Sequence, residues 1–401
     1  MAGKRIAYII FILFVGLFSI FYNVYFTMIF FFAVVLLPFL MLLGAWMSLR
    51  KLSVKLTADP VITEKNKETE VRFEAVNDSA IPVTRLEICY TYRNEISGAV
   101  KKDRLYLSVD KKGSAYSVII VRSEHCGNIK VTIERIRCYD FLGIFRTSRK
   151  LKKWATISVM PSIHPMAGDL IRKTADMEME EESNHYLEHK PGNDPSEIFG
   201  VREYKEGDRP NQIHWKLTRK NQKLIMKEYS QPLRDRAILY LSFRNNDKGE
   251  KRLQSTDYFM EAVMSVSEGI LGKGHEHRLV WYDRNSKQYI EQEITNPDSS
   301  REAQMALLGA AFYETGFPEK DYGQQETDGN VLYITNEINE QEIIKWHRGG
   351  NRLLYVVYIN DLEKAPIGTG MEEFLAASFI PCYRIDITKM EETIFKLGIT
   401  A

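Results

Sequence analysis

The hydrophobic pattern separates the first fifty residues from the rest of the chain. Residues 6–22 are apolar throughout, and residues 26–47 form a second apolar run. Each run approaches the roughly 20 residues that a helix needs to cross a hydrocarbon core of about 30 Å. A signal peptide followed by a core helix is the alternative, but no small-residue cleavage site follows the first run. The pattern therefore predicts a transmembrane helical hairpin over residues 1–50.

Basic residues flank this hairpin on both sides. Lys4 and Arg5 precede the first apolar run, Arg50 and Lys51 follow the second, and the loop between the runs carries no charge. Basic flanks of a span stay preferentially on the cytoplasmic side of the bilayer. We therefore expect a multi-pass protein of the cell membrane, with two spans in the lipid bilayer and both termini in the cytoplasm.

Residues 51–160 alternate apolar and polar positions with a period of two. This alternation is typical of half-buried strands, and it is clear in residues 71–77, 86–92, 116–121 and 129–136. Turn-forming Asn, Asp, Ser and Gly residues separate the runs. Short strands at this spacing, with no helical stretch between them, predict a small antiparallel β-sandwich.

Residues 236–401 alternate between apolar strands and amphipathic helices. Residues 237–243 form the first expected strand, residues 256–271 the first helix, and residues 277–294 a hairpin. Continued alternation to the end of the chain predicts a mostly parallel sheet with helices on both faces. A single hairpin after the first helix resembles the von Willebrand factor A arrangement. The expected fold class is therefore multi-domain: a transmembrane helical hairpin, a β-sandwich and a C-terminal α/β domain that is von Willebrand factor A-like.

Residues 161–235 form the expected connector, and they concentrate aromatic, basic and turn-forming residues in one short segment. That segment resembles the signature of the domain-of-unknown-function 58 family, R-x-Y-x-x-G-D-x-x-R-x-I-x-W-K. The positions that match are Arg202, Tyr204, Gly207, Asp208, Ile213, Trp215 and Lys216. Asn211 stands where the family usually has Arg, and residues 218–220 replace a small Ser-Ala-Arg-like element.

The resemblance implies that the protein works together with other proteins. Members of this family commonly occur beside MoxR-type AAA+ ATPases and membrane-bound transglutaminase-like proteins. A von Willebrand A-like domain would then serve as an adaptor for an ATPase that matures or assembles other proteins. The expectation is a membrane-anchored, non-enzymatic scaffold or adaptor.

A metal-binding von Willebrand A domain carries Asp-x-Ser-x-Ser at the end of its first strand, because carboxylate and hydroxyl oxygens suit a divalent cation. Here the segment reads Tyr-Leu-Ser-Phe-Arg over residues 240–244. Ser242 is present, but no Asp precedes it, and Arg244 would bring a positive charge to the site. The sequence therefore predicts no metal and no other cofactor.

The signature segment also permits a catalytic interpretation. Asp208 and His214 could act as an acid/base pair of an uncharacterised hydrolase, with Lys216 as an electrophile. No recognisable nucleophile elbow or phosphate-binding loop accompanies them. The structural interpretation has Tyr204 and Trp215 packed under the loop, with His214 capping a carbonyl. On that interpretation the segment is a clasp between the β-sandwich and the α/β domain.

Charge and cysteine usage narrow the possible partners and the compartment. Fifty-four basic and 53 acidic residues give a net charge of +1, which offers no support for a nucleic-acid partner. The four cysteines are scattered and show no zinc-ligand spacing. Free thiols agree with a reducing compartment.

Overall fold

The computed structural model describes residues 2–22, 24–171, 191–192, 194–205, 213–230, 237–312, 330–348 and 353–398. The chain forms two compact units, each assembled from segments that are far apart in sequence. Unit 1 contains residues 1–162, 245–261 and 304–314, and unit 2 contains residues 163–244, 262–303 and 315–401. The domain boundaries expected at residues 50, 160 and 235 stay predictions.

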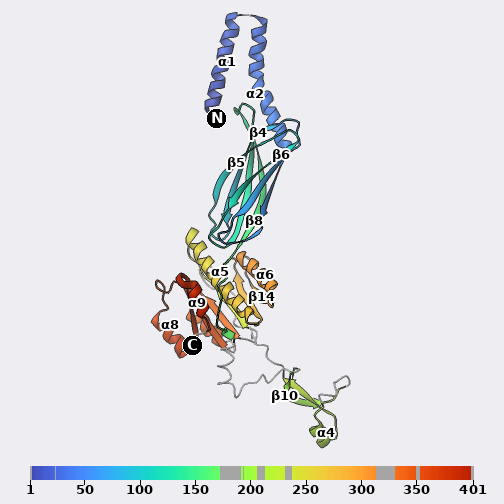
Figure 1. Cartoon of the computed structure of the whole chain (residues 1–401), viewed down its shortest axis with the longest axis vertical. Coiled ribbons are helices and arrows are strands. Elements are labelled where there is room, and N and C mark those ends of the chain that lie inside the picture. The colour runs from blue at the N-terminus through green and yellow to red at the C-terminus, as the bar shows by residue number, and fades with distance from the viewer. Residues whose placement is uncertain are drawn as a thin grey trace. The chain divides into compact units, whose positions relative to one another are not determined.

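Two long apolar helices, α1 (Ala2–Tyr22) and α2 (Tyr25–Lys51), open the chain and lie side by side (Figure 1). Both are long and apolar enough to cross a membrane, and most of their large side chains are exposed. The Tyr8 hydroxyl donates to the Val34 carbonyl at 2.7 Å, and a Cβ at Gly16 would lie 3.1 Å from the Phe31 ring. The small residue therefore permits the close approach of the two helices.

Unit 1 contains two β-sheets. The three-stranded sheet has the order β1-β3-β6, and the five-stranded sheet has the order β2-β8-β7-β4-β5. The strands are β1 (Leu52–Asp59), β2 (Ile62–Glu64), β3 (Thr69–Asn77), β4 (Val83–Asn94), β5 (Lys101–Val109), β6 (Gly113–Val121), β7 (Gly127–Tyr139) and β8 (Arg146–Met160). All pairings are antiparallel except that of β2 with β8, so one sheet is mixed, contrary to the wholly antiparallel prediction.

The two sheets share one hydrophobic core. Along β3 the buried positions alternate with more exposed ones, as the period of two predicts. Val71 and Phe73 from this strand join Ile88 and Val131 from the other sheet in a single buried cluster. The rings of Phe73 and Tyr90 lie 5.0 Å apart between the sheets. Each fully buried aliphatic side chain of this kind contributes about 1.5–3 kcal/mol to folding.

Unit 2 contains a six-stranded sheet with the order β14-β13-β12-β15-β16-β17. Its strands are β12 (Ala237–Ser242), β13 (His277–Asp283), β14 (Gln288–Ile294), β15 (Asn330–Thr335), β16 (Leu353–Asn360) and β17 (Cys382–Asp386). Neighbours are parallel except β13 and β14, which form an antiparallel pair. Every residue of β15 is buried, as in a parallel sheet covered on both faces.

Helices alternate with these strands along the chain. They are α5 (Gly249–Gly272), α6 (Pro297–Leu308), α7 (Glu340–Arg348), α8 (Thr369–Ala377) and α9 (Met390–Lys396). Trp346 of α7 and Leu375 of α8 pack with Tyr240, Val280 and Tyr333 of the sheet. The predicted multi-domain layout, with apolar N-terminal helices, β-sheets and α/β content, is confirmed.

Part of the expected connector has a fold of its own. Strand β10 (Asp194–Glu203) pairs antiparallel with β11 (Ile225–Ser230), which also pairs with the short β9 (Pro191–Gly192). Helix α4 (Trp215–Asn221) lies between β10 and β11 in the sequence. The signature segment therefore sits on a small sheet-and-helix module, which we call the signature module (residues 194–205 and 213–230).

Candidate functional site

The signature module brings together most of the residues that match the family signature. Arg202 lies in β10, and Tyr204 follows that strand directly. Ile213 forms an isolated antiparallel bridge with Met226 of β11. His214, Trp215 and Lys216 begin α4, whereas Gly207 and Asp208 lie outside the described residues.

Backbone hydrogen bonds join two parts of the signature segment, at residues 204 and 214, to the adjacent residues 224 and 225. The Tyr204 amide donates to the Leu224 carbonyl at 2.9 Å, and the His214 amide donates to the Ile225 carbonyl at 2.7 Å. Residues ten positions apart in the sequence are therefore held next to each other. Both parts of the motif are therefore attached to the start of strand β11.

Helix α4 is held against β11 through its polar groups. His214 is the N-cap residue, and its Nδ1 accepts a hydrogen bond from the Leu217 amide at 3.3 Å. The Thr218 hydroxyl oxygen accepts a hydrogen bond from the Ile225 amide at 3.0 Å. Gln222, in the left-handed region with φ 54°, ends the helix. His214 therefore caps a backbone amide, whereas the sequence led us to expect that it would cap a carbonyl.

The expected burial of the two aromatic residues is wrong. Trp215 is 66 % exposed and Tyr204 is 41 % exposed. Trp215 lies three positions before Thr218, about 60° from it around the helix axis, so it stands at the edge of the side that faces β11, and its side chain extends into solvent. Among the module's residues whose burial the structure describes, the buried ones are Ile225 and Met226 of the strand.

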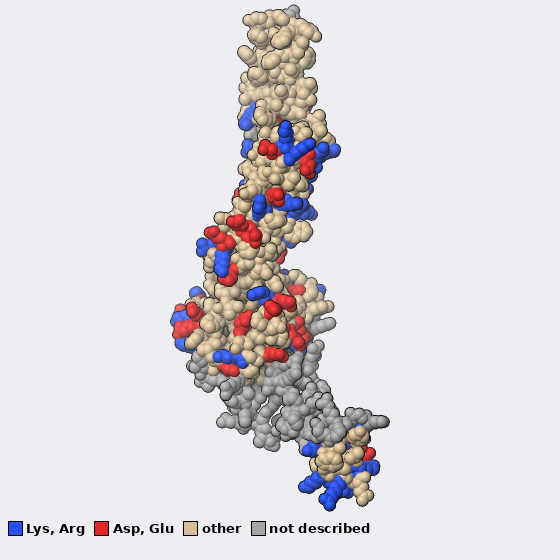
Figure 2. Space-filling model, turned by 45° about the vertical axis from the view of Figure 1, so that its right-hand side comes forward, with Lys and Arg blue, Asp and Glu red and all other residues tan. Residues whose placement is uncertain are grey.

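Positive charge accompanies the exposed tryptophan. Lys216, Arg219 and Lys220 of α4 are all exposed, and Figure 2 shows blue side chains gathered on this module. Lys223 pairs with Glu203 at 2.7 Å, which raises the pKa of the lysine. Both partners of that pair are exposed, so it contributes little to stability. We call the surface formed by Trp215, Lys216, Arg219 and Lys220 the basic–aromatic face.

A second polar cluster lies at the carboxyl end of β12, beside β15. In the sheet, β12 has β13 on one side and β15 on the other, so the direction in which successive strands are added reverses beside β12. Folds of this kind bind ligands at such a switch point. The Arg244 guanidinium donates to Glu342 Oε1 at 3.2 Å, and the Ser242 hydroxyl donates to Glu342 Oε2 at 3.3 Å. Tyr333 donates its hydroxyl to the same carboxylate. Asn336 accepts from the Arg244 amide at 3.0 Å and donates to its carbonyl at 2.7 Å.

The groups at this switch point satisfy one another. The side chains of Arg244 and Glu342 are each 12 % exposed, and their charges offset. Burial, with the Glu342 carboxylate, holds the pKa of the Tyr333 hydroxyl well above its usual range, so the phenol stays neutral. No group of three or more His, Cys, Asp or Glu side chains within the described ranges could hold a metal ion. The expected lack of metal binding stays a prediction.

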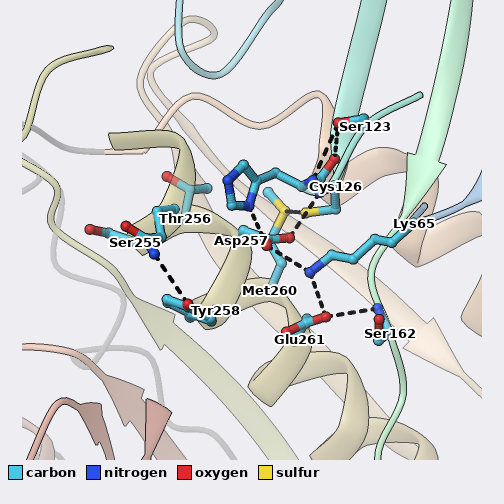
Figure 3. Close-up of polar contacts among 12 residues, drawn as sticks. Lys65, Ser123, Cys126, Ser162, Ser255, Thr256, Asp257, Tyr258, Met260 and Glu261 are labelled. Atoms are coloured by element: carbon cyan, nitrogen blue, oxygen red, sulfur yellow. Dashed lines mark hydrogen bonds and ion pairs between the residues drawn. The ribbon is translucent and has the colours of Figure 1, made fainter. Parts of the chain in front are cut away.

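A third cluster, in unit 1, has no signal in the sequence. Figure 3 shows Lys65 bonded to both Asp257 and Glu261. Its Nζ lies 2.6 Å from Asp257 Oδ2 and 2.6 Å from Glu261 Oε1. The two acids are four residues apart and so share one face of α5. His125 Nδ1 lies 2.9 Å from Asp257 Oδ2, and the Cys126 amide donates to Asp257 Oδ1 at 2.8 Å.

This third cluster is a buried set of ion pairs that links Lys65 to helix α5. Burial by itself lowers the pKa of Lys65, but the charges and hydrogen bonds of Asp257 and Glu261 outweigh it and raise that pKa. The lysine is therefore charged at neutral pH and holds the turn after β2 to α5. Buried ions of this kind are stable only while they are paired. Because 192 residues separate Lys65 from Asp257, no local pattern could reveal the pairing.

The chain matches no family model and no curated relative. Among solved structures, the CARDB domain of a Pyrococcus furiosus protein is 16 % identical, with a TM-score of 0.20, and the match covers 27 % of this chain and 86 % of that domain. WR4, a C. elegans MSP family member, is 13 % identical, with a TM-score of 0.17 and coverage of 26 % and 96 %. Bacteroides uniformis β-glucuronidase is 8 % identical, with a TM-score of 0.17 and coverage of 84 % and 39 %. Such low scores do not bear on the fold or function of this chain.

Proposed function

We propose that this protein is a membrane-anchored, non-enzymatic adaptor of the domain-of-unknown-function 58 family. It works with a MoxR-type AAA+ ATPase in protein maturation or complex assembly, beside a transglutaminase-like membrane protein. In this proposal helices α1 and α2 anchor it in the cell membrane, which their length and apolar composition support, and the basic flanks Arg5 and Arg50 support a cytoplasmic location of both termini.

Support for a von Willebrand A-like domain comes from the topology of the six-stranded sheet. Its only antiparallel neighbours are β13 and β14, which form the hairpin after helix α5. Strand β12 is central, with β13 on one side and β15 on the other. In the sequence, strand β12 is followed by helix α5 and then by the β13–β14 hairpin, and this succession resembles that of a von Willebrand A domain.

The observation that carries the adaptor proposal is the Arg244–Glu342 pair at the switch point. A guanidinium occupies the position where a metal-binding domain of this type would bring a divalent cation. The carboxylate that could serve a ligand is already bonded to Arg244, Ser242 and Tyr333. With its polar groups mutually satisfied, this edge of the sheet suits a protein-binding domain better than a catalytic centre.

The alternative is the hydrolase that uses Asp208 and His214. The geometry favours a structural part for His214, because its Nδ1 already accepts a hydrogen bond from the Leu217 amide. Capping the first turn of α4 accounts for a histidine at this position without catalysis.

Affinity purification of the tagged full chain from its own membranes, with ATP, with ADP and without nucleotide, tests the proposal. An adaptor should recover a MoxR-type ATPase in near-stoichiometric and nucleotide-dependent amounts. The double variant Asp208→Asn/His214→Gln separates the two functions. Loss of a hydrolytic turnover in this variant, with partner recovery unchanged, would establish the enzyme instead.

A further inference from the structure

We propose that the basic–aromatic face of α4 is the docking surface for an acidic patch on a protein partner. Trp215 enters an apolar pocket at one edge of that patch, and Lys216, Arg219 and Lys220 pair with the carboxylates beside it. The inference rests on the proposed adaptor function, since it specifies where and by what chemistry a partner binds.

The geometry of α4 places these four side chains on one side. At about 100° per residue, positions 215, 216, 219 and 220 fall within an arc of about 140°. Leu217 and Thr218, which lie outside that arc, are half-buried, and the Thr218 hydroxyl is bonded to the Ile225 amide of β11. Among residues 215–220, the four exposed ones are therefore the four of the basic–aromatic face.

The positive charge is concentrated locally and is not a property of the whole chain. Residues 201–227 contain eight bases and three acids, whereas the whole chain has a net charge of +1. One of these acids, Glu203, pairs with Lys223, which lies outside α4. A local field of this kind steers an oppositely charged partner and selects its orientation.

The tryptophan supplies the apolar anchor. When a partner covers a side chain of this size that is 66 % exposed, the buried apolar area stabilises the complex. Tryptophan and arginine are the residues most enriched among those that dominate binding energy in protein interfaces. The His214 cap and the Thr218–Ile225 bond hold the backbone of α4 in place before binding, which reduces the ordering cost of association.

A protein partner fits this face better than a bilayer or a nucleic acid. Helices that lie on membranes carry a wide apolar side opposite their bases, but here the bases and the only aromatic residue of α4 share one side. Single-stranded nucleic acid is bound by several stacking aromatics along a basic groove. One large aromatic residue with three bases beside it on the same side of the helix matches an apolar pocket flanked by carboxylates on a protein.

Site-specific photo-crosslinking in cells tests the surface directly. The full chain would carry p-benzoylphenylalanine in place of Trp215, and the crosslinked peptide would be sequenced by mass spectrometry. The expected product is a protein adduct whose crosslinked segment is acidic. The triple reversal Lys216→Glu/Arg219→Glu/Lys220→Glu should reduce that adduct roughly tenfold or more. A single Arg219→Glu reversal should reduce it partially.

The matched control reverses three exposed lysines outside the module, Lys102→Glu/Lys111→Glu/Lys152→Glu, and should leave the adduct unchanged. A lipid or nucleic-acid adduct, no adduct, or a protein adduct unaffected by the triple reversal would overturn the inference. An acidic protein that is not an ATPase would refute the proposed ATPase partnership but not the docking surface. An ATPase that binds the triple variant as tightly as the parent would refute the surface and leave the adaptor function standing.

Discussion

Two tryptophans of this chain occupy opposite environments. Trp215 is 66 % exposed on α4, whereas Trp281 in β13 is fully buried. We expect Trp215→Ala to change the free energy of unfolding by no more than about 0.5 kcal/mol, as is usual for surface positions. Trp281→Ala leaves a large cavity and should cost about 3–5 kcal/mol.

Thermal unfolding of the purified full chain in detergent, with both variants measured in parallel, checks this contrast. An equal loss of stability in the two variants would show that Trp215 is buried after all. The clasp expected from the sequence would then regain support, because that interpretation requires Trp215 to pack under the loop.

His277 makes the stability of unit 2 depend on pH. Its Nε2 lies 2.7 Å from the Ser267 hydroxyl, and burial lowers the pKa of the imidazole from 6.5 to about 4. The folded state therefore binds a proton less readily than the unfolded chain. This contribution is fully present above about pH 6.5 and is lost as the pH falls toward 4. At about 1.36 kcal/mol per pKa unit, the loss amounts to about 3 kcal/mol.

The comparison with His277→Gln isolates this effect. Between pH 7.5 and pH 5, the unfolding temperature of the parent should fall further than that of the variant, because glutamine does not titrate. The same pH dependence in both proteins would mean that the imidazole does not control it.

At the scale of elements, the tie between Lys65 and helix α5 should be energetically large. Lys65→Met leaves Asp257 and Glu261 as buried carboxylates without their cation, and removing one partner of such a cluster costs about 3–5 kcal/mol. Lys67→Met is the matched control, because the pair of Lys67 with Glu64 is exposed on both sides. It should cost less than about 1 kcal/mol. Equal unfolding temperatures for the two variants would contradict a structural function for the cluster.

The elements differ in how much of them a sequence can predict. The apolar helices and the period-two strands follow from local patterns, as does the alternation of strands and helices after residue 236. The side of α4 that faces outward depends on which residue the strand β11 bonds, and that contact is Thr218 with Ile225. The Lys65 cluster depends on pairing across 192 residues. Local periodicity does not encode which distant residues come into contact. The outward side of α4 and the Lys65 cluster therefore could not be predicted from the sequence.

At the scale of the whole molecule, the topology in the membrane can be tested with single cysteines. In a variant that lacks Cys89, Cys126, Cys138 and Cys382, one cysteine is introduced at Asn23 or at Gln254. The uncharged loop should face outward, so an impermeant thiol reagent should label position 23 in intact cells. Position 254, an exposed position of α5, should be labelled only after the membrane is opened. The reverse labelling would invert the orientation and exclude a cytoplasmic ATPase partner.

The most direct test of the adaptor function is binding of a purified MoxR-type ATPase to the full chain in lipid nanodiscs. Interferometry would give the dissociation constant with ATP, with ADP and without nucleotide, and a parallel assay would follow ATP hydrolysis. We expect saturable binding whose affinity depends on the nucleotide, together with a change in the hydrolysis rate. The absence of binding in all three states would contradict the account.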